Sequence, residues 1–471
     1  MGELAPDSGE VTVAKGKTIG YLAQYQDKDS NETIYNEVLH ACDALIEKEE
    51  KLRKMEEDMQ HVSADELEKY MEQYNRFSHA FELEGGLTFR SEINGVLKGL
   101  GFSENDFGKK MSELSGGQKT RVALGRLLVT KPDIIMLDEP TNHLDMASIA
   151  WLENYLLNYK GAVIIVAHDR YFLDRIVTKV VEISRHTATV FPGNYTAYAR
   201  QKEIQRESLL RQYYNQQREI KHQEEVISKL KSFNREKSIK RAESREKALD
   251  KIERIEKPID EKTDMHITLE PEITSGNDVL SVKGLSKSYE HKLFSNIDFQ
   301  IKRGEKVALI GNNGTGKTTI LKIINGIVDA DAGEIKLGSN VEIGYYDQEH
   351  QNLDPDKTLF DEIADAYPNL KATKIRNVLA AFLFTDDDVF KRIRDISGGE
   401  RGRVSLAKLM LSNANFLILD EPTNHLDIMS KEILESAINS YTGTVLYVSH
   451  DRYFINKTAS RILDLKNETI L

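Results

Sequence analysis

The sequence predicts an α/β protein in which one domain occurs twice, with an α-helical hairpin between the two copies and a helical insertion in the first copy. The segment LDEPTNHLD stands at Leu137–Asp145 and again at Leu419–Asp427, so Asp420 follows Asp138 at an offset of 282 (420 − 138). The pairs LSGGQ and ISGGE, and AHDRYF and SHDRYF, repeat at the same offset. Three motifs in one register indicate two copies of one domain.

The offset changes upstream of these motifs. GEVTVAKGKTIGYLAQ resembles GEIKLGSNVEIGYYDQ, with Gly9 matching Gly333 at an offset of 324 (333 − 9). The difference of 42 (324 − 282) is an insertion in the first copy between Gln24 and Ser115. Leucines and methionines recur there at spacings of three and four among dense charges, which predicts an amphipathic helical hairpin at about residues 32–85. A helical insertion without a function of its own is the alternative.

A phosphate-binding loop, GNNGTGKTT, occurs once. It follows the apolar run KVALI and precedes ILKIINGI, which has helical spacing. Glycines in such a loop let backbone N–H groups and a helix N-terminus face phosphates. Lys317 is predicted to contact the β and γ oxygens, and Thr318 to bind magnesium. The predicted loop residues are Gly311, Asn312, Asn313, Gly314, Thr315, Gly316, Lys317, Thr318 and Thr319.

The offset of 324 projects Lys317 to a position before residue 1 (317 − 324 = −7). Likewise, Leu471 corresponds to position 189 of the first copy (471 − 282), just before FPGNY. These projections predict a fragment that begins after the first phosphate loop and ends inside the second copy. A naturally shortened protein is the alternative.

FLILDEP places two carboxylates at the end of an apolar strand. Asp420 is predicted to hold magnesium through water, and Glu421 to orient or deprotonate the attacking water. His450 follows the strand TVLYVS and is predicted to contact the γ-phosphate as a polar sensor. The alternative is a core histidine whose hydrogen bonds are all made within the protein. The same two carboxylates and the histidine recur in the first copy as Asp138, Glu139 and His168.

The SGG motifs and one tyrosine complete the predicted nucleotide site. A helix can begin at a serine followed by two glycines, and the N-terminus of such a helix can bind phosphate. Tyr289 precedes the first glycine of the phosphate loop at an offset of 22 (311 − 289) and is a candidate for stacking on adenine, or simply a tyrosine at a strand end. The predicted SGG residues are Ser115, Gly116, Gly117 and Gln118 in the first copy, and Ser397, Gly398, Gly399 and Glu400 in the second.

The segment between the copies is basic, whereas the whole chain has a net charge of −12. From Arg200 to Lys257 there are 17 Lys or Arg and 11 Asp or Glu, and residues 229–245 hold 7 of the basic residues and 2 of the acidic ones. Long helical runs flank this stretch, the second stopped at Pro258, which predicts a helical hairpin with a basic tip. Such a tip suits contact with RNA phosphates, although charge runs are often only solvated faces. The predicted RNA contacts are Lys229, Lys231, Arg235, Lys237, Lys240, Arg241 and Arg245.

Composition narrows the class of protein. Cys42 is the only cysteine, which excludes an internal disulfide and fits a reducing cytosol. The longest apolar runs, such as AVIIVA, have the length of a strand rather than of a membrane span. The first residues show neither a basic nor an apolar signal region. We therefore expect a soluble, cytoplasmic protein.

In this order the motifs resemble those of ATP-binding cassette (ABC) ATPases. The doubled LDEPTNHLD and the HDRYF segments resemble the ABC-F subfamily, whose soluble twin-cassette members act on ribosomes. The resemblance implies a first cassette at 1–195 with a helical arm at about 32–85, an interdomain linker at 196–262, and a second cassette at 275–471. It also implies a monomer whose two cassettes pair within one chain.

The resemblance further implies two sites for ATP and Mg²⁺, each formed by both cassettes. One would combine the phosphate loop, Gln348, Asp420, Glu421 and His450 with the first SGG motif. The other would combine Gln24, Asp138, Glu139 and His168 with the second SGG motif. It has no phosphate loop in this sequence, so ATP is expected to bind there poorly or not at all. Gln348 and Gln24 would be metal ligands by this resemblance.

By the same resemblance, the linker would reach the ribosomal RNA and the tRNA in the peptidyl site. The expected function is an ATPase that acts in translation or protects the ribosome from an antibiotic. Two alternatives stay open. One is a DNA-binding twin-cassette ATPase. The other is the ATPase subunit of a membrane transporter, against which the fused cassettes and the basic linker argue.

Overall fold

The computed structural model of the chain describes residues 5–22, 31–61, 63–184, 186–232, 235–252, 254–255, 271, 273–289, 292–346, 353–384, 386–424, 426–466 and 469–470. Gln24 and Gln348, the predicted metal ligands, lie outside these residues, as does the side chain of Lys237. The chain divides into two compact units, one formed by Met1–Phe172 with His266–Leu471 and one by Leu173–Met265. The predicted domain boundaries stay a prediction.

The first copy contains a parallel sheet in the order β1-β2-β3. LDEP begins in β2 and the AHDRYF segment follows β3, so the two motifs leave the sheet at neighbouring strand ends. In open parallel sheets ligands bind at this edge. The elements are β1 (Ile19–Tyr21), α1 (Ile34–Leu39), α4 (Phe89–Gly99), α5 (Gly116–Thr130), β2 (Ile134–Asp138), α6 (Met146–Leu157), β3 (Ala162–Val166) and α7 (Arg170–Ile176).

The second copy contains a larger sheet in the order β10-β11-β12-β8-β13-β14, parallel except for β14. Its neighbours β11, β12 and β8 end at Asp420, Val448 and Gly311, so three motifs meet at one edge. The elements are β8 (Lys306–Gly311), α10 (Lys317–Ile324), β10 (Ile343–Tyr346), α11 (Leu359–Ala366), α12 (Ala372–Ala381), α13 (Gly398–Met410), β11 (Phe416–Asp420), α14 (Ile428–Ser440), β12 (Thr444–Val448), α15 (Arg452–Thr458), β13 (Arg461–Lys466) and β14 (Thr469–Ile470).

Both faces of this parallel sheet are covered. In β11, Leu417 and Leu419 join a core with residues of α11 to α15, whereas Phe416 and Ile418 join a core on the opposite face. The second core lies against an antiparallel sheet of order β7-β6-β9 and includes Ile320 of α10. A strand covered on both faces has apolar side chains at every position, which confirms the prediction of a buried strand in FLILDEP. The antiparallel strands are β6 (Asp278–Ser288), β7 (Lys292–Lys302) and β9 (Ala332–Leu337).

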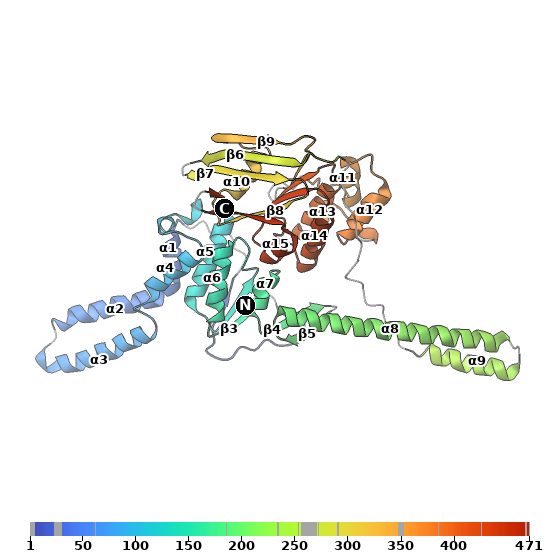
Figure 1. The fold of residues 1–471 in the computed structure, drawn as a ribbon. Coiled ribbons are helices and arrows are strands. Elements are labelled where there is room, and N and C mark those ends of the chain that lie inside the picture. Colours follow the sequence, from blue (N-terminus) through green and yellow to red (C-terminus); the bar gives the residue numbers. More distant parts are fainter. Residues whose placement is uncertain are drawn as a thin grey trace. The chain divides into compact units, whose positions relative to one another are not determined.

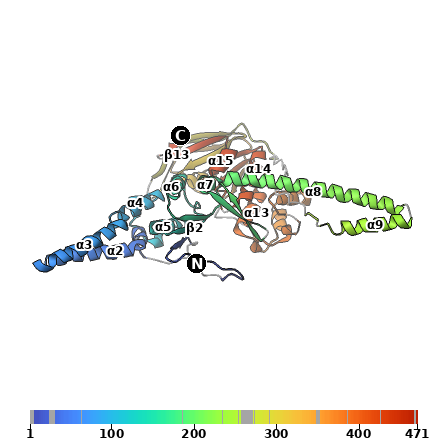
Figure 2. The same ribbon diagram turned by 90° about the horizontal axis from the view of Figure 1, so that it is seen from below.

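The insertion in the first copy forms a helical hairpin, as predicted. Helices α2 (Asp43–Met59) and α3 (Ala64–Leu83), blue in Figures 1 and 2, lie side by side. The Tyr74 hydroxyl donates to Glu56 at 2.5 Å, and the Lys51 ammonium lies 4.9 Å from the centre of the Phe77 ring. The hairpin is thus held by polar and cation–π contacts more than by a deep apolar core.

The second unit, Leu173–Met265, includes the predicted linker at 196–262. It contains the antiparallel strands β4 (Lys179–Ser184) and β5 (Thr187–Pro192), followed by the helices α8 (Tyr195–Ser232) and α9 (Glu236–Leu249). Ile220, Ile227 and Ala242 are buried within this unit. Between α8 and α9, Lys231 pairs with Glu246 at 2.6 Å and Arg245 donates to Gln223 at 2.6 Å. The prediction of two α/β domains joined by a helical hairpin is confirmed.

Candidate active site

The phosphate loop follows β8 and leads into α10. Gly316 has φ +94°, a conformation that favours glycine, and a Cβ atom there would lie 2.9 Å from the Phe294 ring. Lys317, the first residue of α10, is buried, and its ammonium donates to the Gly311 and Asn312 carbonyls at 2.9 Å each. The loop thus forms a backbone cradle with a buried positive charge at its base.

A hydroxyl and a carboxylate meet below this cradle. Thr318 Oγ1 donates to Asp420 Oδ1 at 3.2 Å, and Asp420 is buried at the end of β11. Among the described residues, no group of three or more His, Cys, Asp or Glu side chains is placed to hold a metal. Mg²⁺ usually keeps waters and takes few protein oxygens beside substrate phosphates. The pair of hard oxygens beside a phosphate cradle fits that ion.

Glu421 is held in a strained conformation next to His450. Its φ is +47°, which is unusual for a residue with a Cβ, and its N–H donates to the Val448 carbonyl at 3.0 Å. His450 Nε2 lies 3.3 Å from Glu421 Oε1. Glu421 Oε2 and His450 Nδ1 are buried and have no hydrogen-bond partner among the described residues. Buried polar atoms normally have partners, so both atoms are suited to meet a ligand.

Burial sets the protonation of this pair. It raises the pKa of Glu421 to about 7, with Asp420 raising it further and Lys317 opposing both. Burial also lowers the pKa of His450 to about 3, and the charge of Lys317 acts in the same direction. At neutral pH, His450 is therefore neutral, whereas Glu421 is poised to accept a proton.

The rate of hydrolysis is expected to depend on pH through Glu421. If Glu421 is the general base that the sequence predicts, it works only when deprotonated, so kcat/KM for ATP should fall as pH decreases through about 7 and level off above it. His450→Asn is the control, because His450 does not titrate in this range and its replacement should lower the rate without moving the inflection. A profile without an inflection near neutral pH would contradict the role of Glu421.

The SGG motif of the first copy faces the phosphate loop of the second. Ser115 caps α5, its Oγ accepting from the Gln118 N–H while Gln118 Oε1 accepts from the Ser115 N–H. The motif and the loop line one cavity of about 830 Å³. The predicted site residues in its lining are Ser115, Gly116, Gly117, Gln118, Asn313, Gly314, Gly316, Lys317, Thr318, Thr319, Glu421 and His450.

Direct hydrogen bonds join the two copies at this cavity. The Asn313 N–H donates to Asp145 Oδ2 at 3.1 Å, and the Asn313 side-chain amide donates to the His143 carbonyl at 3.0 Å. Burial would raise the pKa of Asp145, but N–H donors from Ser148 and Asn313 outweigh it and hold the pKa below its usual value. Sequence reasoning missed Asp145 and His143 as site residues, although both belong to the repeated LDEPTNHLD.

Arg121 is another lining residue that the sequence did not single out. Its guanidinium donates to the Leu100 carbonyl at 3.1 Å and lies 4.8 Å from the centre of the Phe102 ring. Arg403, at the repeat offset of 282 (403 − 121), lies over Phe384 in the same way. This repeated contact supports the helix that follows each SGG motif, and the fixed offset is the signal that could have pointed to it.

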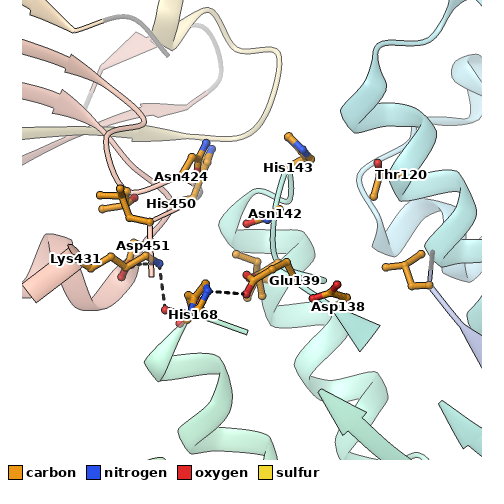
Figure 3. Close-up of a pocket in the computed structure, with 16 residues that line it drawn as sticks. Thr120, Asp138, Glu139, Asn142, His143, His168, Asn424, Lys431, His450 and Asp451 are labelled. Carbon is orange, nitrogen blue, oxygen red and sulfur yellow. Dashed lines mark hydrogen bonds and ion pairs between the residues drawn. The ribbon is translucent and has the colours of Figure 1, made fainter. Parts of the chain in front are cut away.

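The equivalent residues of the first copy lie at a second pocket, of about 300 Å³ (Figure 3). Glu139 repeats the φ of +47°, its N–H donates to the Val166 carbonyl at 2.8 Å, and His168 Nε2 lies 3.6 Å from its Oε1. Burial raises the pKa of Glu139, against the opposing effect of His168. Asp138 also lines the pocket, which Lys431, His450 and Asp451 of the second copy border.

Other predicted site residues lie apart from these two pockets. Among the described residues, Ser397 caps α13 and forms a capping box with Glu400, but Ser397, Gly398, Gly399 and Glu400 do not line the pocket of Glu139. Tyr289 is 60% exposed at the end of β6, with the Lys287 ammonium 5.3 Å from its ring centre. Stacking of Tyr289 on adenine stays a prediction.

Comparisons with known proteins identify the family. A family model described as ABC transporter matches residues 1–142 and 294–424, and a second model with the same description matches residues 181–268. The Bacillus subtilis (strain 168) protein YdiF is 46% identical over 471 residues, covering 100% of this chain and 73% of that protein. ABC transporter F family member 5 of Arabidopsis thaliana is 35% identical, covering 99% of this chain and 68% of that protein. The chain belongs to the ABC-F subfamily.

A solved structure shares the fold of this ABC-F protein. It is the complex of the archaeal ribosomal stalk protein aP1 and the archaeal ribosome recycling factor aABCE1, with a TM-score of 0.54 and 23% identity. The match covers 79% of this chain and 65% of that one. The family models and the ABC-F relatives show that the two domain copies are ABC cassettes and that the ABC-F protein is an ATP-binding and ATP-hydrolysing enzyme. Among the described residues, no helix is both long and apolar enough to cross a membrane.

Proposed function

We propose that this ABC-F ATPase hydrolyses ATP between the phosphate loop of its second cassette and the SGG motif of its first. The contact of Asn313 with Asp145 and His143 carries this proposal, because it brings the two cassettes together at the phosphate cradle. The shared lining of the 830 Å³ cavity supports it. The nucleotide would lie between the backbone donors of the loop and the N-terminus of α5.

The residues of the second cassette then take distinct roles. Lys317 would contact the β and γ oxygens, and Thr318 and Asp420 would hold Mg²⁺, which supplies charge neutralisation on the phosphates when bound. Glu421 would accept the proton of the attacking water, through the carboxylate oxygen that has no partner among the described residues. Neutral His450, with its Nε2–H facing Glu421 Oε1, would accept a hydrogen bond from that water at Nδ1. Gln348 stays a predicted metal ligand.

We propose Asp138, Glu139 and His168 as the corresponding groups of a second site, with Gln24 as a predicted ligand and Ser397, Gly398, Gly399 and Glu400 as its SGG motif. The strained conformation of Glu139 and its approach to His168 support this assignment. The phosphate loop that the structure describes lines the cavity of Glu421. We therefore propose the site of Glu421 as a site of hydrolysis.

We also propose the ribosome as the partner. Six basic side chains near the ends of α8 and α9 support this proposal, since they are exposed in a helical hairpin within an acidic protein: Lys229, Lys231, Arg235, Lys240, Arg241 and Arg245. Exposed Lys and Arg side chains on a helical hairpin can bind the phosphates of ribosomal RNA or of a tRNA in the peptidyl site. The proposed contacts are Lys229, Lys231, Arg235, Lys240, Arg241 and Arg245, together with Lys237, whose side chain lies outside the described residues.

Binding to ribosomes tests this proposal. The variant Glu421→Gln should sediment with ribosomes when ATP is present and remain in the supernatant without it. Excess duplex DNA should not displace it. Displacement by DNA would favour the DNA-binding alternative, and failure to sediment in either condition would contradict the ribosomal proposal.

Neutralising the basic tip is expected to weaken ribosome binding. In a Glu421→Gln background, the triple variant Lys229→Gln, Arg235→Gln, Arg241→Gln should lower affinity and reduce the slope of log affinity against log salt by about 2. Lys283→Gln, Lys302→Gln, Lys336→Gln is the matched control, because it removes the same charge from exposed positions of the second cassette. Equal effects of the two triple variants would contradict a specific role of the tip.

A further inference from the structure

An arginine of the second cassette reaches the first cassette beside the site of Glu421. Arg452 is the first residue of α15 and stands two residues after His450. Its guanidinium forms a hydrogen-bonded ion pair with Glu153 of α6, whose side chain is 0% exposed. The Arg452 guanidinium also lies 4.0 Å from the centre of the Tyr171 ring. A buried carboxylate requires a partner of this kind.

The repeat generates a reciprocal contact. Arg170 and Glu435 correspond to Arg452 and Glu153 at the repeat offset of 282 (452 − 170 and 435 − 153), and they approach to 3.8 Å. Arg170 also donates to a carbonyl of α14 at 2.9 Å and lies 4.6 Å from the Tyr453 ring centre. Burial raises the pKa of Glu435 to about 7 despite Arg170. The two ion pairs therefore occupy equivalent positions in the repeat. The carboxylate lies closer to the guanidinium in the pair of Arg452 and Glu153 than in the pair of Arg170 and Glu435.

Helix α6 connects the Arg452 pair to the phosphate loop. Its capping residue is Asp145, which accepts the N–H of Asn313 at 3.1 Å. Glu153 lies further along the same helix. One rigid element of the first cassette thus contacts both the phosphate loop and the histidine segment of the second cassette.

Short-range bonds connect Arg452 to the turn that carries His450. Asp451 Oδ1 accepts the Phe454 N–H at 3.0 Å, and the Asp451 N–H donates to Ser449 Oγ at 3.1 Å. Fixing the Arg452 side chain therefore fixes the start of α15 and this turn. A shift of about 1 Å in a reacting group can reduce a rate by about 100-fold. The ion pair of Arg452 with Glu153 is therefore expected to affect the rate of hydrolysis at Glu421.

We propose that Glu153 and Arg452 are positioning residues for ATP hydrolysis, the first cassette setting the place of His450 beside Glu421 through this ion pair. The inference rests on the function proposed above for Glu421 and His450. Neither positioning residue lines the 830 Å³ cavity. Their loss is therefore expected to lower kcat and to leave KM for ATP nearly unchanged.

The experiment compares Glu153→Gln and Arg452→Gln with Glu435→Gln and Arg170→Gln in the full chain. Each variant of the first pair should lower kcat by at least about 10-fold, with KM within about twofold. The reciprocal pair serves as the matched control and should change kcat by less. The double variant Glu153→Arg, Arg452→Glu should recover part of kcat, which a general loss of packing would not allow. Melting temperatures show whether each variant is folded.

Three outcomes separate the possibilities. A selective loss of kcat in the Glu153 and Arg452 variants, with recovery in the exchanged pair, supports the inference. Equal effects of the two pairs, or a change in KM alone, overturn it. Glu421→Gln is measured in parallel: if that variant still hydrolyses ATP, the assignment of the active site fails instead, and the two failures are distinguishable.

Discussion

Replacing Glu421 with glutamine is expected to slow ATP hydrolysis by about 10²–10⁴-fold, the usual contribution of a general base, while ATP still binds. Glutamine has nearly the same shape but cannot accept a proton at neutral pH. The wild-type carboxylate is suited to that task because burial raises its pKa to about 7 and one of its oxygens has no partner among the described residues. Single-turnover hydrolysis and equilibrium binding of ATP measure the two effects separately.

Glu139→Gln is the matched control for this substitution. Glu139 has the same conformation and the same kind of histidine neighbour, but it lies at the pocket of the first cassette. Its replacement is expected to leave most hydrolysis intact in this chain. If Glu139→Gln abolished hydrolysis and Glu421→Gln did not, the assignment of the active site would be reversed.

Replacing Lys317 with alanine is expected to abolish measurable ATP binding. Lys317 is the buried cation of the phosphate cradle, 7% exposed, and its ammonium is held by two loop carbonyls. Removing one member of a buried charged pair costs about 3–5 kcal/mol, which corresponds to a loss of affinity of about 100-fold or more. Equilibrium dialysis with labelled ATP, or fluorescence of a bound nucleotide analogue, gives the dissociation constant.

Lys322→Ala provides the control on the same helix, because Lys322 lies in the last turn of α10, away from the phosphate loop. It removes the same charge and should leave the dissociation constant within about twofold. The melting temperatures of both variants without nucleotide show whether each is folded. Equal affinity of the two variants for ATP would show that the nucleotide does not bind in this loop.

The repeat and the chemistry of the motifs could be read from the sequence because both are local. A strand covered on both faces needs apolar residues at each position, so FLILDEP predicts a buried strand. A phosphate-binding loop needs its glycines, so GNNGTGKTT predicts such a loop. The fixed offset between the copies then transferred each assignment to the other cassette. The helical arm and the linker hairpin were predictable for the same reason, since helical periodicity is a property of short segments.

The sequence by itself determined the two cassettes, the single phosphate loop and the residue types of the site. The tertiary structure alone decided the contacts of Asn313 with Asp145 and of Arg452 with Glu153, which join residues 168 and 299 positions apart. It also decided the protonation of Glu421 and His450. The physical reason is that burial and cross-cassette contact depend on how distant segments pack, and a carboxylate acquires a pKa near 7 only once that packing has removed water from it.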